Sequence, residues 1–201
     1  MINEFNPSII NFETLTPCEA TAESGIAPPD PYLFAINAER AILLAEQAGV
    51  TTVSSSMESS EPRLSFCPVG NDVAIVSPDG RVSGCYLLPD EWEKRGLNFD
   101  FGHWKPGEGI TILPDRLQAI RQFPVLKPRC EACFCQFSCA GGCHVNQTLP
   151  GGSYELTDFC IQTRILTACR LLRELGFFDL SQALLKDRPA MERLAYQLCK
   201  I

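Results

Sequence analysis

The sequence predicts an α+β protein, and three observations support that prediction. A short apolar run, a helix signal and a β-branched run follow one another before residue 54. A turn signal then joins two short strand-forming segments, and further along cysteine-rich turns alternate with helical patterns. With 201 residues, 45% of them hydrophobic and 20% charged, the chain can form one compact domain or two small ones.

The N-terminal segment predicts a strand–helix–strand unit. Ile9 to Phe12 is a short apolar run, which indicates a buried strand. Asp30 is placed to cap a helix with Pro31 in its first position, and Gly49 is placed to end that helix. Val50 to Val53 is β-branched and predicts a second strand. We expect the two strands to be parallel, as in a βαβ unit.

A β-hairpin is predicted next. The segments from Val73 to Val76 and from Arg81 to Cys85 flank Ser77-Pro78-Asp79-Gly80, a sequence that favours a tight turn. Before this hairpin, the serine-rich stretch from Ser54 to Ser60 predicts a linker. We place a domain boundary there and expect three segments, at residues 1–60, 61–178 and 179–201.

The region after the hairpin predicts a loop and then helices. Gly102, Pro106 and Gly109 indicate the loop, because these residue types favour turns. Thr157 is a candidate cap and Gly176 a candidate stop for the longest of the later helices. Helices are predicted near Asp115–Phe123, from Thr157 to Gly176, near Leu180–Lys186 and near Ala190–Leu198.

Charge and hydropathy exclude several classes of partner. The net charge of −7 and the pI near 4.9 argue against binding to nucleic acid or to an anionic membrane. No apolar run approaches the length of a bilayer span. Met1 to Glu4 lacks the basic and apolar regions of a secretory signal. We therefore expect a cytoplasmic protein with no nucleic-acid or membrane partner.

Cysteine usage is the unusual feature of this sequence. The chain has 11 cysteines, an odd number, and the cytoplasm keeps thiols reduced, so a disulfide framework is disfavoured. Five of the cysteines fall between residues 130 and 143. Such clustering is typical of metal ligands.

The spacing of these cysteines suits an iron–sulfur cluster. A cube of four irons needs thiolates that converge from different directions, and the Cys130-x2-Cys133 turn can present two of them. The glycines at 141–142 let the backbone turn closely around a cluster. Gly80 turns the hairpin so that Cys67 and Cys85 can approach the same side.

The complete pattern resembles the SPASM domain, the C-terminal extension of many radical S-adenosylmethionine enzymes that modify peptides or proteins. The resemblance covers residues 62 to 175, and residues 9 to 56 resemble the last βαβ stretch of the partial TIM-type barrel in those enzymes. The residues that match the motif are Cys67, Gly80, Cys85, Cys130, Cys133, Cys139, Cys143 and Cys160.

The resemblance implies two 4Fe–4S clusters with interleaved ligands. Cys67, Cys85 and Cys143 would hold the first cluster. The second cluster would be held by Cys130, Cys133, Cys139 and Cys160. Some family members have a further cysteine just before the Cys67 position, but residues 58–62 contain no thiol. Either the first cluster keeps an open or exogenously ligated iron, which we favour, or Cys18 or Cys135 supplies the fourth ligand.

The chain departs from the radical enzymes in one respect that decides its chemistry. Those enzymes bind their catalytic cluster through Cys-x3-Cys-x2-Cys, a spacing that this sequence does not contain. We therefore expect no binding of S-adenosylmethionine by this chain alone and no complete catalytic site. The resemblance implies a second polypeptide that supplies the rest of the barrel, and a peptide or protein substrate.

Two other functions fit the same residues. Four-cysteine zinc sites also use Cys-x2-Cys pairs, so a structural zinc protein is one alternative. A stand-alone electron carrier or binding module is the other.

Cys169 and Cys199 lie on apolar helical stripes and are expected in the core. His144 is expected either to donate a hydrogen bond to a cluster sulfur or to be a solvated side chain. The phenylalanines at 134 and 137 are expected either to shield a cluster from water or to pack in the core.

Overall fold

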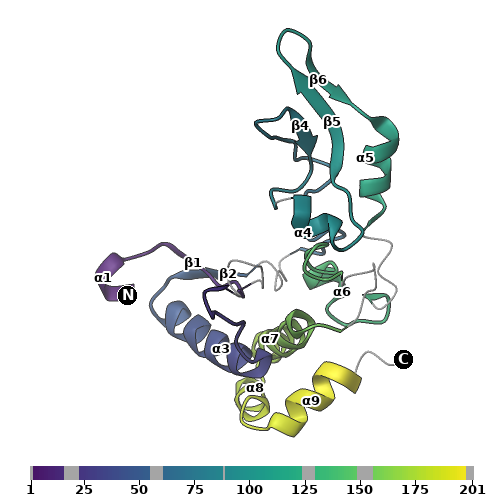
Figure 1. Cartoon of the computed structure of the whole chain (residues 1–201). Helices are drawn as coiled ribbons and strands as arrows, with labels where there is room; N and C mark the ends of the chain where they lie inside the picture. Colours follow the sequence, from purple (N-terminus) through teal and green to yellow (C-terminus); the bar gives the residue numbers. More distant parts are fainter. Residues whose placement is uncertain are drawn as a thin grey trace. The chain divides into compact units, whose positions relative to one another are not determined.

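The computed structural model confirms the α+β class. Helices combine with a two-stranded parallel sheet and a four-stranded antiparallel sheet (Figure 1). No helix in the part of the chain that the structure describes is long and apolar enough to cross a bilayer. The described residues are 2–15, 23–54, 61–87, 89–123, 130–148 and 156–197.

Contacts divide the chain into two compact units, which we describe separately. Unit 1 comprises residues 1–64, 129–142 and 156–201, and unit 2 comprises residues 65–128 and 143–155. The helices after residue 156 pack onto the N-terminal βαβ unit within unit 1. The three continuous segments expected from the sequence stay a prediction.

Unit 1 contains the predicted βαβ unit. After the short helix α1 (Ile2–Phe5), strand β1 (Ile9–Asn11) pairs in parallel with β2 (Thr51–Val53), and α3 (Pro31–Gln47) connects them. The parallel strand–helix–strand prediction is therefore confirmed. The strands are shorter than expected, and β1 is not the buried strand that was predicted, because Ile9 and Asn11 are exposed.

Local sequence determines where α3 begins and ends. The Asp30 carboxylate accepts hydrogen bonds from the backbone N–H groups of Tyr32 at 3.0 Å and Leu33 at 2.9 Å, with Pro31 in the first turn. Gly49 follows the helix with a φ of +71°, a conformation that glycine adopts without strain. Both predicted signals are confirmed.

Three C-terminal helices complete unit 1. Helix α7 (Asp158–Glu174) packs along α3, and α8 (Phe178–Leu184) and α9 (Arg188–Gln197) pack against α7. These helices confirm the ones predicted after residue 157. The fully or nearly fully buried core consists of Tyr32, Ala35, Ala38, Ile42, Ile161, Ile165, Leu166, Cys169, Leu185, Met191 and Ala195.

Unit 2 is built on an antiparallel sheet with the strand order β3-β4-β5-β6. Strands β3 (Ile75–Val76) and β4 (Arg81–Ser83) form the predicted hairpin. The predicted loop at Gly102, Pro106 and Gly109 is wrong, because β5 (Asp100–Lys105) and β6 (Gly109–Ile112) form a second hairpin there. Gly102 is a strand residue whose missing Cβ leaves room for the Thr111 carbonyl oxygen.

Unit 2 has an aromatic core to which two short helices contribute. Helix α4 (Pro89–Glu93) buries Trp92, whose ring lies 5.2 Å from that of Phe99. Helix α5 (Pro114–Arg121) confirms the helix predicted near residue 115 and buries Ile120.

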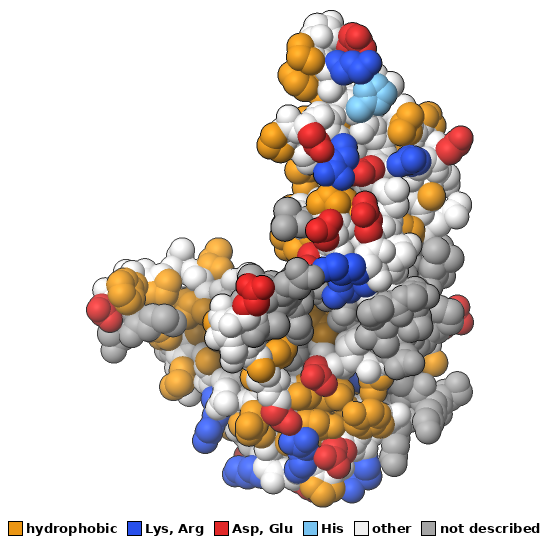
Figure 2. All heavy atoms as spheres, viewed as in Figure 1, with side chains coloured by type: hydrophobic (Ala, Val, Ile, Leu, Met, Phe, Trp, Pro, Cys, Tyr) orange, Lys and Arg blue, Asp and Glu red, His pale blue; other side chains and the backbone are white. Residues whose placement is uncertain are grey.

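Acidic and basic side chains are interspersed on the face of the molecule shown in Figure 2, so the acidic side chains on this face do not form one patch.

Replacing Gly80 tests the tightness of the first hairpin turn. Gly80 has a φ of +85°, and a Cβ there would lie 2.7 Å from the Trp104 carbonyl oxygen. We expect Gly80→Ala to lower the free energy of unfolding by about 3 kcal/mol, measured by urea denaturation. Gly107→Ala is the matched control, because Gly107 has a φ of +80° but a Cβ there would meet no atom within 4 Å. It should lose only about 1 kcal/mol, and equal losses would contradict the role of Trp104.

Candidate metal-cluster sites

Four of the seven motif cysteines line one cavity in unit 1. The cavity is formed by the turn after residue 130, the short helix α6 (Gln136–Cys139) and the first two turns of α7. Each of the four thiols is partly exposed. The residues that line the cavity are Cys130, Cys133, Cys135, Gln136, Cys139, Gly141, Cys160, Thr163 and Arg164.

Tight backbone turns bring the first three thiols together. The Cys133 N–H donates to the Cys130 carbonyl at 3.1 Å, which closes the Cys-x2-Cys turn. Helix α6 then presents Cys139. It is followed by Ala140, Gly141 and Gly142, all with positive φ, so the chain reverses immediately after the last thiol.

The fourth thiol comes from the start of α7. Thr157 caps this helix as predicted, because its hydroxyl oxygen accepts from the Cys160 N–H at 3.4 Å. The same hydroxyl lies 3.6 Å from the Cys160 sulfur, within hydrogen-bonding distance. The cap therefore orients both the backbone and the thiol of Cys160.

Arg164 gives this cavity a positive charge, and the sequence reasoning missed it. It lies one helical turn after Cys160, so both side chains occupy the same face of α7. A hydrogen bond with Cys135 and the nearby Arg164 guanidinium lower the pKa of the Cys133 thiol to about 5. The hydrogen bond with Cys133 and burial raise the pKa of Cys135. This shift favours the thiolate of Cys133, which is the form that binds metal.

The other three motif cysteines meet in unit 2. Cys67, Cys85 and Cys143 all pack against the aromatic core of that unit. Burial, together with the neighbouring thiols of Cys143 and Cys67, raises the pKa of Cys85 to about 11. The sequence of unit 2 contains no fourth cysteine.

The remaining candidate residues are placed as follows. Cys169 is buried in the core of unit 1, as expected, whereas Cys18 and Cys199 lie outside the described residues. His144 is buried against the rings of Phe99 and Phe123, so a solvated histidine is excluded.

The two aromatic residues among the cysteines are not core residues. Phe134 is 37% exposed and Phe137 is 54% exposed, so the core-packing alternative is wrong for both. Cys135, by contrast, is buried in the cavity of unit 1 beside the four motif thiols.

Among the described residues, no three or more His, Cys, Asp or Glu side chains are grouped so that they could hold one metal ion. Four thiolates around one zinc lie about 3.8 Å apart, given Zn–S bonds of about 2.3 Å. Thiolates around a four-iron cube lie farther apart. The cavity in unit 1 measures about 20 Å³, and the four motif thiols and Cys135 line it.

Comparison with protein-family models, curated proteins and solved structures finds no match to this chain.

The two sets of thiols should differ in reactivity when the protein is free of metal. We expect iodoacetamide at pH 7 to modify Cys133 at least about tenfold faster than Cys85, because only the thiolate reacts. The expected order follows from the pKa of about 5 for Cys133 and of about 11 for Cys85. Alkylation of Cys85 should accelerate as the pH rises toward 11. Peptide mapping by mass spectrometry measures both rates, and equal rates at pH 7 would contradict the assignment.

Proposed function

We propose that this chain is the auxiliary-cluster component, or a fragment, of a radical S-adenosylmethionine maturase that modifies a peptide or protein. In this proposal it binds two 4Fe–4S clusters in a SPASM-type domain, next to a βαβ remnant of the barrel. The observation that supports the proposal is the division of the motif cysteines between the two compact units.

That division follows the interleaved ligand sets rather than the order of the sequence. Cys139 and Cys143 are separated by three residues, yet they belong to different units. Cys143 joins Cys67 and Cys85 in unit 2, although it lies more than fifty residues from either of them. Cysteines that served only as small core residues would have no reason to separate in this pattern.

The residues of unit 1 suit a four-thiolate cluster. Cys130, Cys133, Cys139 and Cys160 would be the ligands, and the Thr157 hydroxyl would orient the last of them. Arg164 would offset part of the negative charge that four thiolates bring into a partly buried site. When bound, such a cluster supplies one-electron exchange.

Unit 2 offers three cysteine ligands, which favours an open iron. Cys67, Cys85 and Cys143 would hold three corners of a cube, and no further cysteine occurs in the sequence of that unit. An open corner would accept an external ligand, such as a group of the peptide substrate. We therefore prefer an open or exogenously ligated first cluster to one completed by Cys135, which lines the cavity of unit 1.

The parallel sheet of unit 1 offers a place for the missing barrel. Ser8 and Phe12, which flank β1, hydrogen bond to β2, so the backbone groups of Ile9 and Asn11 face the opposite edge. Strand pairing at such an edge is a common mode of association. A second polypeptide in the cytoplasm would add its strands there.

Metal analysis separates the proposal from a zinc protein. Protein prepared without oxygen should contain about eight irons and eight sulfides per chain. Serine in place of Cys67, Cys85 and Cys143 together should remove about four irons. Serine in place of the four cysteines of unit 1 should remove the other four.

Two single variants serve as controls for this measurement. Cys169→Ala should keep all of the iron, because Cys169 lies in the apolar core. Cys135→Ser should also keep it if Cys135 is a neighbour and not a ligand. Stoichiometric zinc without sulfide would exclude both clusters, and reversible reduction without any partner would favour the electron carrier.

The proposed partner can be tested at the β1 edge. A chain that carries Cys-x3-Cys-x2-Cys, encoded beside this one, should co-purify with it on co-expression. Asn11→Pro should weaken that complex at least tenfold, because it removes an N–H donor that faces away from β2. Thr52→Pro is the matched control on the far edge of the sheet and should leave binding unchanged. A monodisperse monomer that binds no such chain would count against this part of the proposal.

A further inference from the structure

Helix α7 carries one buried arginine, Arg164, and one half-buried arginine, Arg173, that face different surroundings. Arg164 is 5% exposed and Arg173 has a side chain that is 15% exposed. A guanidinium is always charged in a protein, and a buried charge without a counter-charge is strongly destabilising. The groups that surround each arginine therefore show how its charge is balanced.

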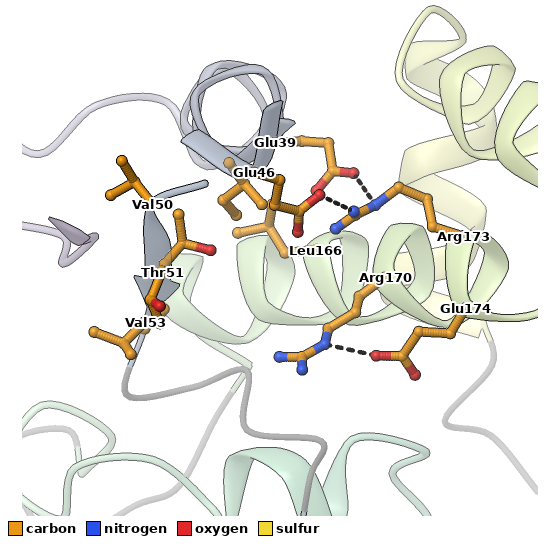
Figure 3. Close-up of a pocket in the computed structure, with 12 residues that line it drawn as sticks. Glu39, Glu46, Val50, Thr51, Val53, Leu166, Arg170, Arg173 and Glu174 are labelled. Atoms are coloured by element: carbon orange, nitrogen blue, oxygen red, sulfur yellow. Dashed lines mark hydrogen bonds and ion pairs between the residues drawn. The ribbon is translucent and has the colours of Figure 1, made fainter. Parts of the chain in front are cut away.

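Two carboxylates balance the positive charge of Arg173. Its Nε lies 2.8 Å from Glu39 Oε1, and its Nη1 lies 2.7 Å from Glu46 Oε2 (Figure 3). Glu39 is itself only 1% exposed, so this pair is an internal ion pair between α3 and α7. The pair lines a separate cavity of about 430 Å³ beside β2, which contains no cysteine.

The groups that surround Arg164 are thiols instead of carboxylates. Among the residues that line its cavity, none is an aspartate or a glutamate, and five are cysteines. The guanidinium hydrogen bonds to Cys133 and, through Nη1, donates to the Ala195 carbonyl of α9. This second bond anchors the cation on a neighbouring helix, so it stays beside the thiols.

We propose that Arg164 is a positioning residue that raises the reduction potential of the cluster in unit 1. This inference depends on the cluster proposed above. Reduction adds one electron to a site that already carries four thiolates, with no bond made or broken. A fixed cation in a partly buried site stabilises the more negative state more strongly, and nearby charge is one of the factors that set cluster potentials.

The test is a redox titration of anaerobically reconstituted protein, followed by electron paramagnetic resonance with dithionite as the reductant. Arg164→Gln should lower the one-electron reduction equilibrium constant at least tenfold, which corresponds to about 59 mV. Arg164→Lys keeps the charge and should recover most of that loss. Iron and sulfide content should be equal in all three proteins.

Arg173→Gln is the matched control. It removes a half-buried, ion-paired guanidinium from the same helix, so it should lower thermal stability, but it should leave the potential unchanged. An unchanged potential in Arg164→Gln, or an equal shift in Arg173→Gln, would overturn the inference. Absence of iron and sulfide from the wild-type protein would instead refute the proposed function, so the two failures are distinguishable.

A measurement on the wild-type protein covers the case in which Arg164→Gln does not fold. Since a guanidinium does not titrate, the potential of this cluster should be constant between pH 6 and pH 9. A slope near 59 mV per pH unit would show that a proton, and not Arg164, balances the added electron. That result would overturn the inference.

Discussion

The packing of α7 along α3 is the constraint on which unit 1 depends. It closes the core, places Cys160 and Arg164 beside the turn that begins at Cys130, and brings Arg173 against Glu39. A helix repeats every 3.6 residues, so one α7 surface can contribute to the core while another contributes to the cysteine cavity. Unit 2 has no equivalent long helix among its described residues, and its aromatic core holds its three cysteines instead.

Features that depend on neighbouring residues could be predicted from the sequence. The α3 boundaries follow from Asp30, Pro31 and Gly49, whose effects act within one turn of backbone. The second hairpin could not be predicted in this way. Gly102 indicated a loop, but it is required by close contact with Thr111 on the next strand, which is a non-local contact.

The candidate site shows the same contrast between what the sequence predicts and what only the fold determines. The resemblance of the cysteine motif to the SPASM domain implies the two sets before any fold is known, whereas the role proposed for Arg164 depends on which groups the fold brings around it. In the sequence, Arg164 and Arg173 are two similar residues on one amphipathic helix. Only their surroundings in space distinguish a cation that faces thiols from one that faces carboxylates.

The chain passes from unit 1 to unit 2 and back twice, and this path has an evolutionary consequence. Neither thiol set is encoded by one continuous stretch of gene. A recombination breakpoint between codons 130 and 143 would divide both sets, and one anywhere between codons 67 and 160 would divide at least one of them. The two sites should therefore be inherited, duplicated and lost together, as a single genetic block.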